Sequence, residues 1–328
     1  MNMHTLIQRY GVQIPTLIVV VIVVSVAVPL FRGEAAIFST LEGMVLLGIV
    51  AAGIATTMIA GELDLSVGSM AIFSGVIAIQ FSSLGLVPAM ALGTTVCAIV
   101  GALQGYMIVK LHMSSLVLTV ATSILLQGAA WLLASGRPIA LKDLTATDML
   151  LERFLVFTPA SVTAILVIAG LGVFLSRTRW GRELYATGGA RAEAAAAGVS
   201  VRKSMMTAFG ISAGCAGLAG ALTCMQGGSA DPGGFNYVLL TAVAACLIGG
   251  VSLYGGRGDA INVALGVLIL TVVTSSMAAA GAPTYLANLI TGSLLIVVVT
   301  IDFIVRRLTA ARLSNKRAHV IEEAAVPG

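Results

Sequence analysis

The residues of this chain best suited to chemistry lie in a short polar stretch, Ala60–Ser69, inside an otherwise apolar run. Charged side chains that face lipid are costly, so we expect this stretch at a membrane edge, beside a wet cavity or against another protein. An Asp followed two residues later by Ser also suits the start of a helix, where both side chains accept from free backbone N–H groups. Capping and gating therefore both remain open. The candidates for a gate or pathway are Glu62, Asp64, Ser66 and Gly68.

A second unusual stretch, residues 177–203, combines basic residues, glycines and a run of alanines. Two adjacent glycines are expected to break the chain, and an alanine-rich helix should follow over residues 192–197. This helix buries too little apolar surface to be stable alone. It therefore suits a groove on a partner protein, and the alternative is a plain connector. The candidate partner-contacting residues are Gly188, Gly189, Arg191, Glu193, Ala195, Ala196 and Gly198.

Two amide side chains within apolar runs, Gln104 and Asn288, are further pathway candidates. Their alternative role is a hydrogen bond between helices. The sequence contains no nucleotide-binding loop and none of the common hydrolase or metalloprotease motifs. Its four cysteines lie in apolar segments without metal-ligand spacing. We therefore predict no enzyme, no catalytic or metal-binding residue and no cofactor on this chain.

The elements that must position these residues are apolar helices. Hydrophobic residues make up 58% of the chain and charged residues 10%, whereas about a quarter of a soluble domain is charged. The net charge of +4 is too small to suggest binding to nucleic acid. We predict an all-α, polytopic membrane protein with about ten transmembrane helices. The expected spans are residues 14–31, 41–60, 67–83, 86–109, 116–135, 158–175, 204–225, 238–252, 260–280 and 285–305.

The distribution of basic residues predicts the orientation. With both termini in the cytoplasm, 14 of the 18 Lys and Arg residues lie on the cytoplasmic side. The first apolar run is long for a signal peptide and is expected to remain as a span. On the outer side, residues 136–157 should form an amphipathic helix on the bilayer surface or a dock for an extracytoplasmic partner.

One transmembrane domain should occupy residues 1–328, with residues 14–305 embedded in the membrane. Residues 177–203 would be a cytoplasmic segment, and residues 306–328 a cytoplasmic tail. Glycines spaced by four, as at Gly101 and Gly105 and again at Gly210 and Gly214, predict close helix packing within one chain. A dimer face is the alternative.

Three motifs stand out along the chain. They are Ala60–Ser69 (AGELDLSVGS), Trp180–Gly189 (WGRELYATGG) with Ala195, Ala196 and Gly198–Arg202 after it, and Leu247–Gly258 (LIGGVSLYGGRG). With these motifs in this order, the chain resembles the permease subunit of bacterial ABC importers of the ribose, xylose, arabinose and galactoside type over about residues 41–302. It departs from the usual pattern of that family at Glu62, where the family usually has a second glycine, and at Ala190, where it usually has asparagine. The first departure adds an acidic residue to the first motif.

The resemblance implies a type II-like permease of the bacterial inner membrane that moves a monosaccharide or related polyol. It implies a second permease copy or a sister permease, a cytosolic ABC ATPase that holds ATP and Mg, and a periplasmic or lipid-anchored sugar-binding protein. It also implies that the helix within Gly189–Ser200 couples ATPase closure to opening of the pathway. The rival interpretation is a secondary carrier of sugar or another solute that works without an ATPase.

Overall fold

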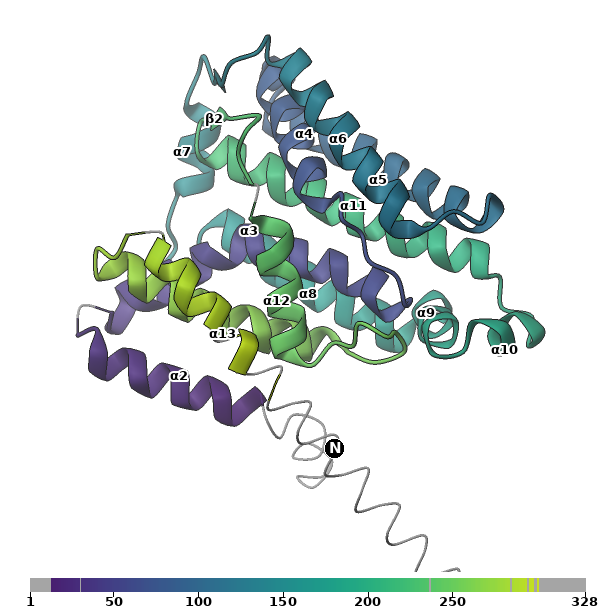
Figure 1. The fold of residues 1–328 in the computed structure, drawn as a ribbon. Helices are drawn as coiled ribbons and strands as arrows, with labels where there is room; N and C mark the ends of the chain where they lie inside the picture. Colours follow the sequence, from purple (N-terminus) through teal and green to yellow (C-terminus); the bar gives the residue numbers. More distant parts are fainter. Residues whose placement is uncertain are drawn as a thin grey trace, which may run out of the picture.

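A computed structural model describes residues 13–29, 31–235, 237–283, 285–293, 295–297 and 300. Both chain ends and the predicted tail at 306–328 lie outside the described residues. The fold is mostly helical (Figure 1). The helices are α2 (Gln13–Ala27), α3 (Gly33–Ile59), α4 (Val67–Gln80), the 3-10 turn η1 (Ser82–Leu84), α5 (Leu86–Lys110), α6 (Ser115–Leu133), α7 (Thr145–Leu151), α8 (Pro159–Arg177), α9 (Arg179–Gly189), α10 (Arg191–Ala196), α11 (Val201–Gln226), α12 (Val238–Gly249) and α13 (Ala260–Ala279).

Helices α3 and α11 form the centre of the molecule (Figure 1). Helix α11 contacts α5, α4 and α3, and α3 also contacts α13, α8 and α12. In the most apolar 18-residue stretch of each helix, 56% of α3 and 67% of α11 is buried within the chain. The corresponding share is 22% in both α5 and α6. An apolar helix that is largely unburied within its own chain suits contact with lipid or with another subunit.

Small residues let α11 approach its neighbours closely. A Cβ atom on Gly101 would lie 2.3 Å from the carbonyl oxygen of Phe209, and one on Gly105 would lie 2.4 Å from that of Met205. Further along α11, a Cβ atom on Gly220 would lie 1.9 Å from the carbonyl oxygen of Ala71 in α4. The predicted packing of the spaced glycines within one chain is therefore confirmed.

The long helices run between two ends of the molecule (Figure 1). The α7 end consists of α7 and an antiparallel ribbon of β1 (Ile139–Ala140) and β2 (Ser229–Ala230). The α10 end consists of α9, α10 and the loops that join α3 to α4 and α12 to α13. The two-residue ribbon is an addition to the predicted all-α class, and α7 forms within the predicted amphipathic stretch.

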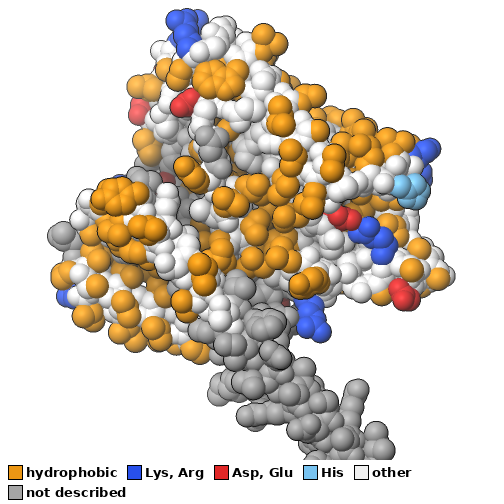
Figure 2. Space-filling model, in the orientation of Figure 1, with side chains coloured by type: hydrophobic (Ala, Val, Ile, Leu, Met, Phe, Trp, Pro, Cys, Tyr) orange, Lys and Arg blue, Asp and Glu red, His pale blue; other side chains and the backbone are white. Residues whose placement is uncertain are grey.

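Six of the described helices are long and apolar enough to cross a membrane. Shorter apolar helices occur at Gln13–Ala27, Val67–Gln80, Val238–Gly249 and Tyr285–Val297. On the face shown in Figure 2, hydrophobic side chains cover most of the body and charged side chains gather toward its edges. The chain is therefore a multi-pass membrane protein, and the count of ten spans stays a prediction.

Candidate functional site

Two loops and the end of helix α9, far apart in the sequence, meet at the α10 end of the molecule. We call their contact the glycine junction, formed by Gly61, Gly188, Gly255 and Gly256. The backbone N–H of Gly256 donates to the carbonyl oxygen of Ile59 at 2.8 Å. A Cβ atom on Gly188 would lie 1.9 Å from that same oxygen, and one on Gly255 would lie 2.5 Å from the oxygen of Gly188. Only residues without a Cβ allow the three backbones to approach this closely.

The predicted break at Gly188 and Gly189 is wrong. Helix α9 continues through both glycines, and the chain turns at Ala190, where φ is −157° and ψ is 86°. Gly188 supplies a smooth helix surface for the junction, because its missing side chain leaves room for Ile59. A Cβ atom on Gly189 would meet no described atom within 4 Å, so the two neighbours have different roles.

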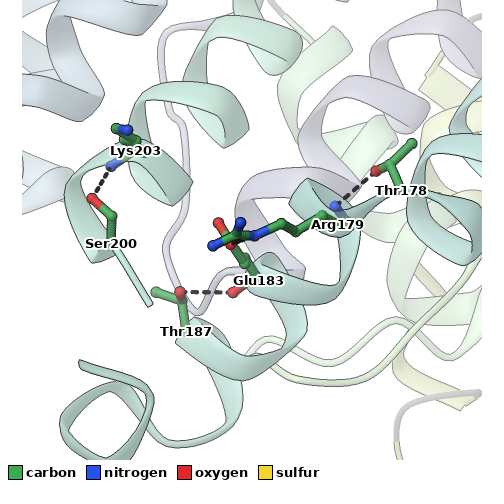
Figure 3. A network of polar contacts seen from close by, with 7 residues as sticks. Thr178, Arg179, Glu183, Thr187, Ser200 and Lys203 are labelled. Atoms are coloured by element: carbon green, nitrogen blue, oxygen red, sulfur yellow. Dashed lines mark hydrogen bonds and ion pairs between the residues drawn. The ribbon is translucent and has the colours of Figure 1, made fainter. Parts of the chain in front are cut away.

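Polar contacts hold α9 at its start (Figure 3) and near its middle. The hydroxyl of Thr178 accepts from the backbone N–H of Gly181 at 3.0 Å, and the side chain of Arg179 pairs with Glu183 at 2.6 Å. The Tyr185 hydroxyl donates to the carbonyl oxygen of Gly258 at 2.6 Å. Helix α9 is thus tied both to its own start and to the loop between α12 and α13.

Helix α10 forms one residue earlier than predicted and is otherwise as expected. Glu193 lies in its first turn, where the helix dipole favours an anion. Gly198 follows the end of α10 and has a φ of +86°, the left-handed conformation that often terminates helices. Its backbone N–H donates to the carbonyl oxygen of Ala195 at 3.0 Å. Ala194 is buried, whereas Ala195 and Ala196 are exposed. The exposed face is slim and made of small residues.

Glu62 joins two groups of residues that the sequence did not connect. One carboxylate oxygen pairs with the guanidinium of Arg191 at 2.8 Å. The other accepts from the hydroxyl of Ser115, at the start of α6, at 2.5 Å. The pathway candidate Glu62 and the coupling candidate Arg191 therefore form one contact between the α3–α4 loop, α10 and α6.

Asp64 points away from this contact and is completely buried. It accepts from the backbone N–H and the hydroxyl of Ser66 at 2.9 and 2.6 Å, and from the hydroxyl of Ser212 in α11 at 2.9 Å. Ser66, and not Asp64, occupies the N-cap position of α4. Direct capping by Asp64 is therefore wrong, and this carboxylate instead ties the loop to α11.

The remaining pathway candidates lie in different surroundings. The amide of Gln104 in α5 is buried and donates to the hydroxyl of Ser66 at 3.3 Å. Gly68 lies in the first turn of α4, where a Cβ atom would be 3.4 Å from the carbonyl oxygen of Phe235. Asn288 is exposed. The structure brings Gln104, Asp64 and Ser66 together and leaves Asn288 outside that cluster.

A cavity of about 820 Å³ separates α10 from the loop between α5 and α6. Glu62, Arg191 and Ser115 lie in its wall, and the rest of the wall is mostly apolar. Among the described residues, no group of three or more His, Cys, Asp or Glu is placed to hold a metal ion. The site is a junction of loop and helix contacts beside a cavity.

Sequence reasoning missed several residues of this site. Ser115 and Ser212 are single hydroxyls in ordinary helical surroundings, and nothing in their spacing marks them as partners of a carboxylate. Gly255 and Gly256 stood in a recognised motif without an assigned role. The available signal was the presence of three glycine-containing motifs in one chain. Contact between these motifs would have predicted the glycine junction.

Comparison with known proteins places these motifs in context. The family model described as "Branched-chain amino acid transport system / permease component" matches residues 36–299. The fructose import permease protein FrcC of Rhizobium meliloti is 29% identical over 82% of this chain and 78% of its own length. The L-arabinose ABC transporter permease protein AraH of Azospirillum brasilense is 29% identical, over 90% and 88%. The ribose import permease protein RbsC of Bacillus subtilis is 28% identical, over 87% and 90%. No solved structure gives a significant match.

Proposed function

The chain belongs to the family of permease components of branched-chain amino acid transport systems, and we propose that it is the permease subunit of an ATP-driven importer of a monosaccharide or related polyol. The carrying observation is the glycine junction, which ties α9, the helix directly before the exposed α10, to the loops that lead into α4 and α13. A push on α10 would therefore reach helices on both sides of α3. This arrangement suits a subunit that receives force from a partner and does no chemistry itself.

The shape of α10 supports its proposed role as the coupling element. Its six residues are too few for a stable isolated helix, and its outer face presents Ala195 and Ala196. Small side chains let a helix sit deep in a groove on another protein. Turns at Ala190 and Gly198 bound the helix, and the adjacent cavity leaves room for displacement.

The polar groups of the described helices favour a neutral, hydroxyl-rich solute over an amino acid. In the six helices long enough to span a membrane, the polar side chains more than one turn from the helix ends carry hydroxyls, thiols, amides and the single carboxylate of Glu42. Hydroxyls and amides both donate and accept, as a polyol requires. A zwitterion would instead need charged partners to offset its loss of hydration. The relatives named for fructose, L-arabinose and ribose point the same way.

The proposal includes a cellular setting and partners. Residues 1–328 would form one permease domain in a bacterial inner membrane, with about ten spans, both termini in the cytoplasm and residues 177–203 as the coupling segment. A cytosolic ABC ATPase would bind ATP and Mg, and a periplasmic or lipid-anchored protein would deliver the sugar. A second permease copy or a sister permease would complete the pathway.

Reconstitution into proteoliposomes tests this function. Vesicles that hold the permease with its ATPase and binding protein should take up labelled monosaccharide only when ATP is inside, and should not take up leucine. A bulky charge in Ala195→Glu should abolish uptake while the protein still inserts. Ala35→Glu, an exposed alanine in the first turn of α3 at the opposite end, is the control. Uptake without the ATPase would establish a secondary carrier instead.

A further inference from the structure

The contact between Glu62 and Arg191 links α10 to the rest of the molecule across the edge of the cavity. The carboxylate of Glu62 is largely shielded, with 17% of its side chain exposed, and Arg191 is 45% exposed. The hydroxyl of Ser115 donates to the second carboxylate oxygen at 2.5 Å. Because one carboxylate holds partners from two different helices, its position depends on both of them.

Helix α10 has little else to hold it in place. Of its six residues only Ala194 is buried, and its contacts are mainly with the flanking helices α9 and α11. Toward the loop between α5 and α6 it borders the cavity. An ion pair at the first residue of so short a helix restrains the orientation of the whole helix.

Glu62 also stands next to the group that holds the loop to α11. Two residues further on, Asp64 is bound to Ser66 and Ser212 at 2.6 to 2.9 Å. Ser66 is the N-cap of α4. A displacement of Glu62 therefore acts on a loop whose other end is anchored in the core, at the start of a helix.

We propose that the Glu62–Arg191 ion pair is a latch that holds α10 in one position and reports its displacement to α4 and α6. Glu62 is thus a positioning residue for coupling, and this role rests on the proposed function of the chain. The pair is strong enough to bias α10 and weak enough to open, because partly exposed ion pairs contribute little net stability. Opening it would free α10 from Glu62, which still accepts from the hydroxyl of Ser115 at the start of α6.

Hydrogen exchange on the complete transporter in lipid nanodiscs tests the latch without reference to transport. Glu62→Gln and Arg191→Gln should each speed amide exchange in residues 191–197 by about two- to fivefold. The reversed pair, Glu62→Arg with Arg191→Glu, should return exchange toward the wild-type rate. The difference between Glu62→Gln and wild type should shrink at high salt, since salt screens exposed charges.

Glu183→Gln supplies the matched control. Glu183 pairs with Arg179 on α9 (Figure 3), and its side chain is 18% exposed, close to the 17% of Glu62. Because that pair lies within one helix and does not reach α10, exchange in residues 191–197 should remain at the wild-type rate. Equal acceleration by Glu183→Gln and Glu62→Gln would overturn the latch.

A second readout separates coupling from simple packing. In reconstituted vesicles, Glu62→Gln should lower the amount of solute imported per ATP hydrolysed by about two- to fivefold, and charge reversal should restore the ratio. Faster exchange with an unchanged ratio would overturn the coupling role. Unchanged exchange in both single variants would overturn the latch itself. A wild-type complex that imports nothing with ATP would overturn the proposed function, while the exchange result would still report on the ion pair.

Discussion

Two carboxylates, Glu42 within α3 and Glu62 in the loop that follows this helix, are held in different ways. At the α7 end, Glu42 accepts from the hydroxyl of Thr158 at 2.5 Å and from the amide of Gln226 at 2.6 Å. These partners lie at the start of α8 and at the last residue of α11. At the α10 end, Glu62 holds Arg191 and Ser115, and its neighbours are loops that meet at the glycine junction.

The comparison shows where the molecule is built to move. Glu42 fastens three long helices to one another, so displacement there would require whole helices to shift. Glu62 joins a loop to a six-residue helix that is bounded by turns at Ala190 and Gly198. We infer that the α7 end is the fixed end and that the α10 end transmits motion.

The largest effect should come from filling the glycine junction. In Gly188→Ala the new Cβ atom would lie 1.9 Å from the carbonyl oxygen of Ile59 and 2.9 Å from the nitrogen of Gly256. Both are backbone atoms, so α9 must move away from the end of α3 and from the α12–α13 loop. We expect a loss of stability of about 3 kcal/mol or more, at the upper end of the cost of overpacking, measured as a lower midpoint of thermal unfolding in detergent.

Gly189→Ala is the control for this substitution. A Cβ atom there meets no described atom within 4 Å, and alanine is favoured over glycine in a helix by about 0.5–1 kcal/mol. Its unfolding midpoint should equal or exceed that of the wild type. Equal destabilisation by both alanines would contradict the close approach at Gly188.

The next effect should distinguish Asp64, buried in the α3–α4 loop, from Glu42 in α3. Asp64→Asn keeps the size of a fully buried side chain but removes one of the acceptor oxygens used by Ser66 and Ser212. We expect a cost of about 1–3 kcal/mol. Glu42→Gln, at a partly buried site, should cost about 0.5–1.5 kcal/mol, because the amide of Gln226 can turn to pair with the new side chain.

Denaturant unfolding of the two variants side by side measures this order. Glu42→Gln should also leave the exchange of amides in residues 191–197 unchanged, because its contacts lie at the other end of α3. A larger loss of stability in Glu42→Gln than in Asp64→Asn would contradict our inference that the buried hydrogen bonds of Asp64 contribute more stability than those of Glu42.

The smallest effect should follow from breaking the ion pair on the surface of α9. Arg179 is 78% exposed, and such pairs within one helix contribute about 0.3–0.5 kcal/mol or less. Arg179→Gln should therefore shift the unfolding midpoint by less than either carboxylate variant. A shift as large as that of Gly188→Ala would show that α9 depends on this pair.

Much of the helical framework could be predicted from apolar runs and the glycines between them. The segment expected at 86–109 is α5, Leu86–Lys110, and that expected at 204–225 lies within α11, Val201–Gln226. Helix α10 was predicted to within one residue. These elements are readable because hydrophobic length, helix propensity and stop signals are local properties.

The errors arose where a distant part of the chain decides the local conformation. Gly188 and Gly189 look like a break, yet the helix continues because the backbone of Ile59 packs against Gly188. Asp64 resembles a helix cap in the sequence, yet Ser66 occupies the N-cap position and the buried carboxylate of Asp64 accepts from the hydroxyl of Ser212 in α11. Neither partner is near in sequence, so local pattern could not reveal it.

The sequence by itself determined a set of apolar helices suited to a membrane, the small helix α10 within the basic stretch, and three motifs of one transporter family. Local composition sets hydrophobicity and helix formation, so these features need no knowledge of distant contacts. Only the tertiary structure decided that the three motifs meet at one end, and that Glu62 pairs with Arg191 across 129 positions. Packing of glycine backbones and pairing of charges depend on which surfaces the fold brings within a few ångströms.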